Sequence, residues 1–252
     1  MSYATRRRAA RPYSPWTIDL AYALGLLATD GNLARDGRHL TFVSKDRDLV
    51  DTFLRCVGRT DARIVETRTS SGGAAYRAQL SDGALYDWMW ERGLRPAKSL
   101  TLGPIDVPDE LFAHLLRGLL DGDGSIYVRR QRPTKRLYPD YWYLRIWTYF
   151  TSASSEHIRW LRAAIESHLG ARGWVEMSEN RVDRHPFYRL RFGKADSTVL
   201  LGALYRDPAW PALARKRAIW DQHVREKPTV PKEGIEPSRP FGHTPLKRAR
   251  IT

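Results

Sequence analysis

The sequence predicts an α+β fold made of two pseudo-symmetric units, each with the order αββαββα. Three repeated patterns lead to this prediction. An apolar helical run ending in Asp-Gly occurs twice, as "YALGLLATDGNL" from Tyr22 and "LLRGLLDGDGSI" from Leu115. A second helical pattern ending in Gly follows each run, in "SKDRDLVDTFLRCVG" and "SASSEHIRWLRAAIESHLG". The third pair is "YRAQLSDGALYDWMW" and "YRLRFGKADSTVLLGAL". Repetition in the same order predicts a duplicated structural unit.

The elements of the first unit follow from local signals. Thr17 is a candidate N-cap for the first helix, the Asp36-Gly37 pair is typical of a hairpin turn, and Gly58 is typical of a helix end. We expect helices and strands, in chain order, at 17–29, 32–35, 39–44, 47–57, 62–69, 75–80 and 83–92. The second unit has a longer first hairpin, with Pro133 and Pro139 near its turn.

Composition divides the chain into four parts. We expect a basic disordered arm at 1–14, a first unit at 15–106, a second unit at 107–225 and a disordered tail at 226–252. The tail is rich in proline and charge and has no apolar period, so it cannot bury a core. The duplicated units hold nearly all of the apolar segments.

The chain is strongly basic, with a net charge of +14 over 252 residues. Such an excess favours a polyanionic partner, and nucleic acid is the leading candidate. The single cysteine, Cys56, excludes an internal disulfide and a cysteine-rich zinc site. No apolar segment follows the basic start and none is long enough to span a bilayer. We therefore expect a protein of the cytoplasm, nucleoid or an organelle that is not secreted.

The sequence resembles the LAGLIDADG homing endonucleases in their single-chain form with two motif copies. The copies are "ALGLLATDG", residues 23–31, and "LRGLLDGDG", residues 116–124. Each is followed by the same order of strands and helices and by a matching lysine, Lys98 or Lys216. The first copy departs from the family pattern at Ala28, where an acid is common.

Small residues on both motif helices predict that the helices pack closely. Ala21, Gly25 and Ala28 fall on one helical stripe, and Gly118 and Gly122 do so in the second copy. Close packing would bring the two helix ends, and with them Asp30 and Asp123, to one place. Two neighbouring carboxylates repel each other unless a cation lies between them, and their hard oxygen atoms suit Mg²⁺.

The resemblance implies a site-specific double-strand DNA endonuclease that hydrolyses phosphodiesters across the minor groove. Asp30 and Asp123 would hold the metal, helped by the backbone carbonyls of Gly31 and Gly124. Mn²⁺ is expected to substitute for Mg²⁺, and Ca²⁺ is expected to support binding without cleavage.

Lys98 and Lys216 would complete the catalytic set by stabilising charge on the phosphate or by ordering water. The alternative is that Lys98 and Lys216 are ordinary surface lysines of a basic chain, without a catalytic role. We further expect a monomer, a long and nearly asymmetric DNA target, and a role in intron homing.

In this family two antiparallel sheets form a DNA-binding saddle, in which every second strand residue points at the duplex. Arginine and glutamine suit base edges in the major groove. The DNA-facing residues that we predict are Arg35, Arg38, Thr41, Arg68, Arg77, Gln79, Tyr127, Arg129, Gln131, Arg145, Arg189 and Arg191. Apolar residues should cover the other face of the second sheet, namely Ile126, Val128, Leu144, Ile146, Leu190 and Phe192.

Other interpretations remain for particular residues. Asp-Gly-Asp-Gly could simply stop a helix, although its duplication favours a site, and Asp121 fits a capping or supporting role. A calcium loop opening at Asp121 would place Arg132 where glutamate is needed. The tryptophans and tyrosines fit packing better than base stacking; Trp88, Trp90 and Trp160 in particular should be buried.

An alternative function is a non-cleaving nucleic-acid-binding protein on the same scaffold. It would be either a maturase that holds its host intron RNA or a DNA-binding regulator. Retention of both acids and both lysines argues for the nuclease.

Overall fold

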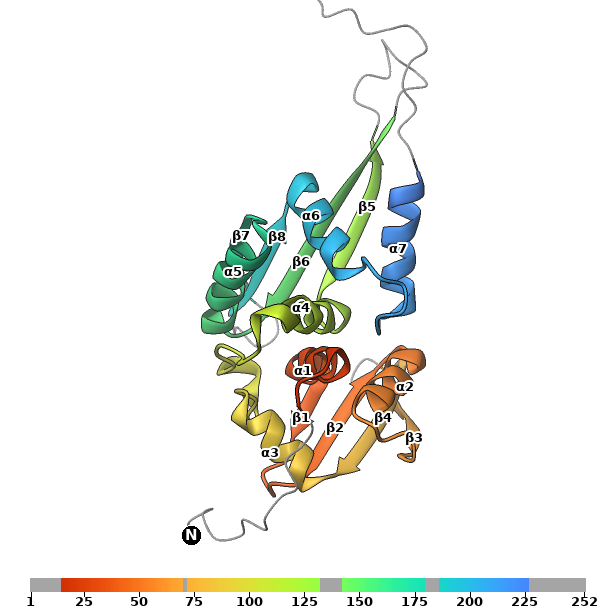
Figure 1. Ribbon diagram of the computed structural model, residues 1–252, viewed down its shortest axis with the longest axis vertical. Helices are drawn as coiled ribbons and strands as arrows, with labels where there is room; N and C mark the ends of the chain where they lie inside the picture. The colour runs from red at the N-terminus through yellow and green to blue at the C-terminus, as the bar shows by residue number, and fades with distance from the viewer. Residues whose placement is uncertain (1–14, 70–71, 132–141, 180–185, 227–252) are drawn as a thin grey trace, which may run out of the picture.

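The computed structural model describes residues 15–69, 72–131, 142–179 and 186–226 (Figure 1). The expected N-terminal arm, all but the first residue of the expected tail and the turn of the long hairpin lie outside these ranges. Helices among the described residues are all too short or too polar to cross a membrane.

The order of the elements confirms the predicted αββαββα repeat. In the first unit these are α1 (Ile18–Asp30), β1 (Gly31–Leu33), β2 (His39–Ser44), α2 (Arg47–Cys56), β3 (Ile64–Arg68), β4 (Ala74–Ser81) and α3 (Gly83–Glu91), followed by a 3₁₀ turn at Lys98–Leu100. A 3₁₀ turn at Asp109–Leu111 leads into the second unit, which comprises α4 (Phe112–Asp121), β5 (Ser125–Gln131), β6 (Tyr143–Ser152), α5 (Ser155–Leu169), β7 (Gly173–Glu179), β8 (Pro186–Phe192), α6 (Lys194–Leu204) and α7 (Ala214–Arg225).

The two sheets have the same topology. The strand orders are β1-β2-β4-β3 and β5-β6-β8-β7, and all neighbouring strands are antiparallel. Figure 1 shows α1 and α4 side by side at the centre of the molecule, with one sheet on each side of the pair. The predicted pseudo-symmetry is therefore present in the fold.

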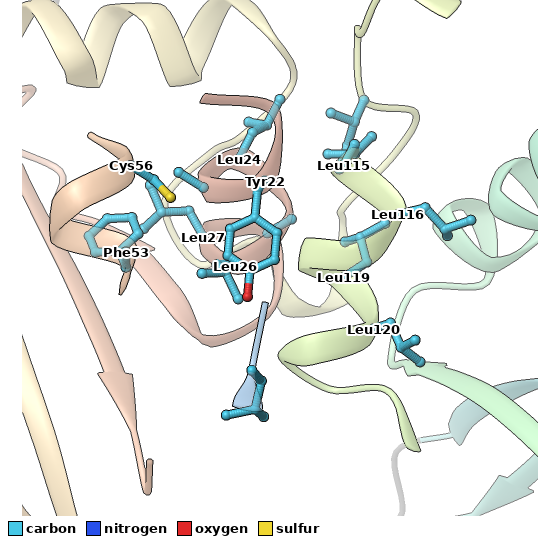
Figure 2. Close-up of a cluster of buried hydrophobic side chains, with 14 of the residues drawn as sticks. Tyr22, Leu24, Leu26, Leu27, Phe53, Cys56, Leu115, Leu116, Leu119 and Leu120 are labelled. Atoms are coloured by element: carbon cyan, nitrogen blue, oxygen red, sulfur yellow. The ribbon is translucent and has the colours of Figure 1, made fainter. Parts of the chain in front are cut away.

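Glycines bring the backbones of α1 and α4 into contact. A Cβ atom on Gly25 would lie 2.3 Å from the carbonyl oxygen of Leu115, and one on Gly118 would lie 2.2 Å from the carbonyl oxygen of Tyr22. Either distance is far below a van der Waals contact, so only glycine fits. Figure 2 shows the buried leucines of both helices, with Phe53 and Cys56 of α2 beside α1.

The two motif copies end differently. Helix α1 runs through Asp30, and Gly31 begins β1 directly. Helix α4 ends two residues before the second acid, because its C-cap, Gly122, has a ψ of −100° and leaves the helix. Asp123 therefore lies in a turn between α4 and β5.

The prediction of burial is right for one of the three tryptophans and wrong for another. Trp88 is 4% exposed, whereas Trp90, two residues further along α3, is 40% exposed. Trp160 of α5 is partly buried against the core. Residues two positions apart on an α-helix lie on nearly opposite faces, which explains why Trp88 is buried and Trp90 is exposed.

Candidate functional site

Asp30 and Asp123 line one cavity of about 560 Å³ where the ends of α1 and α4 meet. Asp30 is half-buried and Asp123 is exposed. The meeting of the two units is close, because a Cβ atom on Gly122 would lie 3.3 Å from Oδ2 of Asp30. The structure thus brings the two predicted acids to the same site.

The electrostatics of this cavity disfavour two free carboxylates. Burial raises the pKa of Asp30 to about 7, with the negative charge of Asp123 as the second cause and the two lysine charges acting against it. Partial desolvation of the Asp123 carboxylate by the surrounding protein raises its pKa too, and the charges of Lys216 and Lys98 oppose this shift. A bound cation would relieve the cost of ionising both acids.

Lys98 and Lys216 occupy equivalent positions in the two units. The Lys98 ammonium donates to the carbonyl oxygen of Gly31, and the Lys216 ammonium donates to that of Gly124 at 2.7 Å. Both side chains are buried. Burial is the main reason why the pKa of each falls to about 8. The lysines therefore contact the backbone immediately after each acid.

Their bonding is nevertheless unequal. Lys216 also donates to the carbonyl oxygens of Leu120 (2.5 Å), Asp121 (2.9 Å) and Gly122 (3.2 Å). These carbonyls are free of helical partners because α4 ends there, so Lys216 caps the helix. Within the described part of the chain, Lys98 has the Gly31 carbonyl as its hydrogen-bond partner.

The donor set fits a hard divalent cation. Mg²⁺ keeps several waters and binds proteins through one or two carboxylates, and Asp30 and Asp123 supply two. Within the described ranges no cluster of three or more His, Cys, Asp or Glu side chains offers a larger site. The carbonyls of Gly31 and Gly124 each have a lysine partner but keep a second lone pair, so their role as metal ligands stays a prediction.

The first sheet places some of the predicted DNA-facing residues on one face. Register pairs Thr41 with Gln79, and Val43 with Arg77, so all four point away from the buried Leu40 and Phe42. Val43 also lines the cavity, so this face is continuous with the acidic site.

Three predicted residues of the first unit lie elsewhere. Arg68 pairs with Ala74 and shares the face of Ile64, which packs against the core, so its predicted orientation is wrong. Arg35 and Arg38 lie in the turn between β1 and β2, because β1 ends at Leu33. Arg38 is within 4.0 Å of Asp36 there.

The second sheet matches the predicted division into two faces. Register places these residues on the face directed away from the core: Tyr127, Arg129, Gln131, Arg145, Arg189 and Arg191. The opposite face holds the expected apolar set, Ile126, Val128, Leu144, Ile146, Leu190 and Phe192. Sequence reasoning missed Glu176, which pairs with Arg191 at 2.9 Å and reduces the free charge of that arginine.

Asp121 supports the site from within the core. It is 1% exposed and accepts hydrogen bonds from the hydroxyls of Tyr22 (2.8 Å) and Tyr205 (2.7 Å) and from the Leu213 backbone N–H (2.7 Å). These bonds tie the end of α4 to α1 and to the start of α7. Asp121 is therefore a supporting residue, as expected, and it does not cap a helix N-terminus.

A second connection between the units was not predicted. Arg215 of α7 forms two hydrogen bonds of 3.0 Å with Asp46, the N-cap residue of α2. Both residues line the cavity. No spacing signal links two residues so far apart in the sequence, so only the fold reveals the pair.

Comparison with known proteins places the chain in a fold class. No family model and no curated protein matches the sequence. Among solved structures, the homing endonuclease I-WcaI bound to its DNA recognition sequence superposes with a TM-score of 0.53 at 12% identity, over 85% of this chain and 92% of that one. I-DmoI in complex with DNA and Ca gives 0.53 at 14% identity, over 82% and 98%.

Full-length DUF199/WhiA from Thermatoga maritima is also similar, with a TM-score of 0.51 at 15% identity. The match covers 86% of this chain and 64% of WhiA, so this chain spans about two thirds of that protein. The chain has the two-repeat LAGLIDADG fold that these structures share. At such low identities the likeness defines the fold.

Proposed function

We propose that this protein is a site-specific double-strand DNA endonuclease of the homing type, active as a monomer with divalent metal. The observation that carries the proposal is the meeting of Asp30 and Asp123, one from each unit, in a single cavity. One antiparallel sheet lies on each side of that meeting point (Figure 1). One chain therefore supplies both acids and both DNA-facing surfaces.

Asp30 and Asp123 would hold Mg²⁺ through their carboxylate oxygens. When bound, the metal would polarise the phosphate and stabilise the leaving oxygen. The chain's own contribution is to hold the two acids together, Asp30 at the last residue of α1 and Asp123 in the turn that follows α4. Lys98 would place its ammonium beside the developing negative charge of the phosphate.

The outward faces of the sheets would lie along the duplex. Arg77, Gln79 and Thr41 in the first unit and Arg129, Gln131 and Arg145 in the second are placed to contact base edges or phosphates. We leave Arg68 out of this set because of its orientation. Affinity should fall steeply as salt rises, since each neutralised phosphate releases counterions.

Selection from a randomised duplex library tests the proposal. Incubation with Mg²⁺ or Mn²⁺ should enrich a long target that is cut on both strands, and Ca²⁺ should give binding without cleavage. Intact libraries in both metals would contradict the endonuclease.

The alternative is a binder that does not cleave. One observation favours it: four backbone carbonyls engage the Lys216 ammonium, which leaves it little capacity for a phosphate. Metal-independent binding to a duplex, or to the RNA of a host intron, with no cut strand would identify this function.

A further inference from the structure

The outward face of the second sheet carries a path of aromatic rings. The path consists of Tyr127 on β5, Trp147 and Tyr149 on β6, and Trp174 on β7. Register places all four on the face directed away from the core. The equivalent face of the first sheet holds no Phe, Tyr or Trp among its described strand residues; its members are Asn32, His39, Thr41, Val43, Val65, Thr67, Ala75, Arg77, Gln79 and Ser81.

The first three rings of the path lie close to one another. The centroids of Tyr127 and Trp147 lie 5.6 Å apart, with their planes 36° from each other. Trp147 and Tyr149 are two residues apart on one strand, a separation of about 7 Å. The path thus crosses the sheet diagonally, and its two ends, Tyr127 and Trp174, are 48% and 45% exposed.

Arginines are interleaved with these rings. The Arg191 guanidinium lies 5.8 Å from the Tyr149 ring and 5.7 Å from the Trp174 ring. Arg191 forms an ion pair with Glu176, which offsets its charge. Arg189 lies 5.5 Å from Tyr149, and its Nε atom is buried without a hydrogen-bond partner in the described structure.

This combination favours unpaired bases over a duplex. A duplex presents base edges and phosphates to a sheet, whereas ring stacking requires the open face of a base. Sheet surfaces bind single-stranded nucleic acid by stacking its bases on exposed aromatic rings, with arginines nearby. Any base can stack in this way because every base has a π face. Arg129 and Arg145, both exposed on the same face, supply charge for the phosphates.

We propose that the aromatic path Tyr127–Trp147–Tyr149–Trp174 binds the unpaired bases of a single nucleic-acid strand. This activity goes beyond the proposed cleavage of duplex DNA and needs neither metal nor the two acids. Base stacking on the rings provides the affinity, and the arginines hold the backbone.

Fluorescence anisotropy in EDTA tests the proposal on the full chain. The probes are a labelled oligo(dT) of about 12 nucleotides and a labelled hairpin duplex with the same number of phosphates. Trp147→Ala should weaken oligo(dT) binding at least about fivefold and leave duplex binding within about twofold. Trp174→Ala, at the other end of the path, should act in the same direction, and Trp147→Phe, which keeps a ring, should retain most of the affinity.

Trp90→Ala is the matched control. Trp90 is an exposed tryptophan that stacks with Arg95 on the first unit, away from the second sheet. Its loss should leave oligo(dT) binding unchanged. Thermal unfolding of each variant verifies that the chain is folded.

An oligo(rU) probe of the same length separates the two sources of a single strand. Tighter binding of oligo(dT) assigns the path to DNA, and tighter binding of oligo(rU) assigns it to RNA. Absence of binding to either strand, or equal loss of single-strand and duplex binding in Trp147→Ala, overturns the proposal. The proposed endonuclease is tested separately, by cleavage of a duplex in the presence of metal.

Discussion

Gly25 of α1 and Gly118 of α4 face each other across the interface between the two units. A Cβ atom on Gly25 would lie 2.9 Å from the Cα atom of Gly118, and one on Gly118 would lie 3.0 Å from the Cα atom of Gly25. The two helices therefore pack backbone against backbone, and this contact brings their C-terminal ends together beside Asp30 and Asp123.

Gly118→Ala should destabilise the protein by at least about 1–3 kcal/mol, the usual cost of overpacking a core. The added methyl group would meet the Tyr22 carbonyl at 2.2 Å, and backbone atoms cannot move aside as a side chain can. Urea unfolding measures the change. The matched control is Gly202→Ala on α6, where the nearest atom would be 3.8 Å away and where alanine should stabilise the helix by up to about 1 kcal/mol. Equal stability of the two variants would show that α1 and α4 are not packed this closely.

We expect Lys216 to act mainly in stability and Lys98 mainly in cleavage. Lys216→Met should lower the free energy of unfolding more than Lys98→Met does, because it leaves four carbonyls without their donor. Lys98→Met should keep most of the stability and slow cleavage of a selected target. Unfolding curves and single-turnover rates of the two variants make the comparison. A larger loss of stability in Lys98→Met would reverse the assignment.

Asp121→Ala should cost several kcal/mol, because three buried donors would lose their acceptor at about 1–3 kcal/mol each. The donors are the Tyr22 and Tyr205 hydroxyls and the Leu213 backbone N–H. Chemical denaturation measures the loss. Asp123→Ala removes an exposed acid two residues away and should have a much smaller effect. If both variants unfold at the same denaturant concentration, Asp121 does not support the end of α4.

Asp30 should make the metal-free protein less stable as pH rises. Its folded-state pKa of about 7 lies above the ordinary aspartate pKa of 3.8, so between these values the folded state binds the extra proton. Stability relative to Asp30→Asn should therefore fall across this window, by at most about 4 kcal/mol, and change little above it. Unfolding at a series of pH values in EDTA gives both curves. Parallel curves would mean that Asp30 ionises normally in the folded protein.

The sequence was sufficient for the features that repeat. The β2 strand was predicted with its observed bounds, His39–Ser44, because alternation and the Asp36-Gly37 turn agree there. The contact between α1 and α4 was predicted from Gly25 and Gly118. A glycine at the same position of both motif copies indicates that the two helices pack closely there. The same repeat identified Asp30 and Asp123 as neighbours in space.

Features that break the repeat could not be predicted. Ile64 and Val65 are adjacent and both apolar, so alternation could not decide which face of β3 Arg68 occupies. The early end of α4 depends on the backbone conformation of Gly122 and on the bonds of Lys216. The partners of Asp121 are 84 to 99 residues away in the sequence, and no local pattern encodes such contacts.

Cleavage of a selected duplex by Asp30→Asn and Asp123→Asn tests the central claim most directly. The claim is that one acid from each unit holds the metal at a shared site. Each variant should lose double-strand cleavage in Mg²⁺ while its affinity for the same duplex in Ca²⁺ or EDTA stays near that of the wild type. Full double-strand cleavage by either variant would contradict the account.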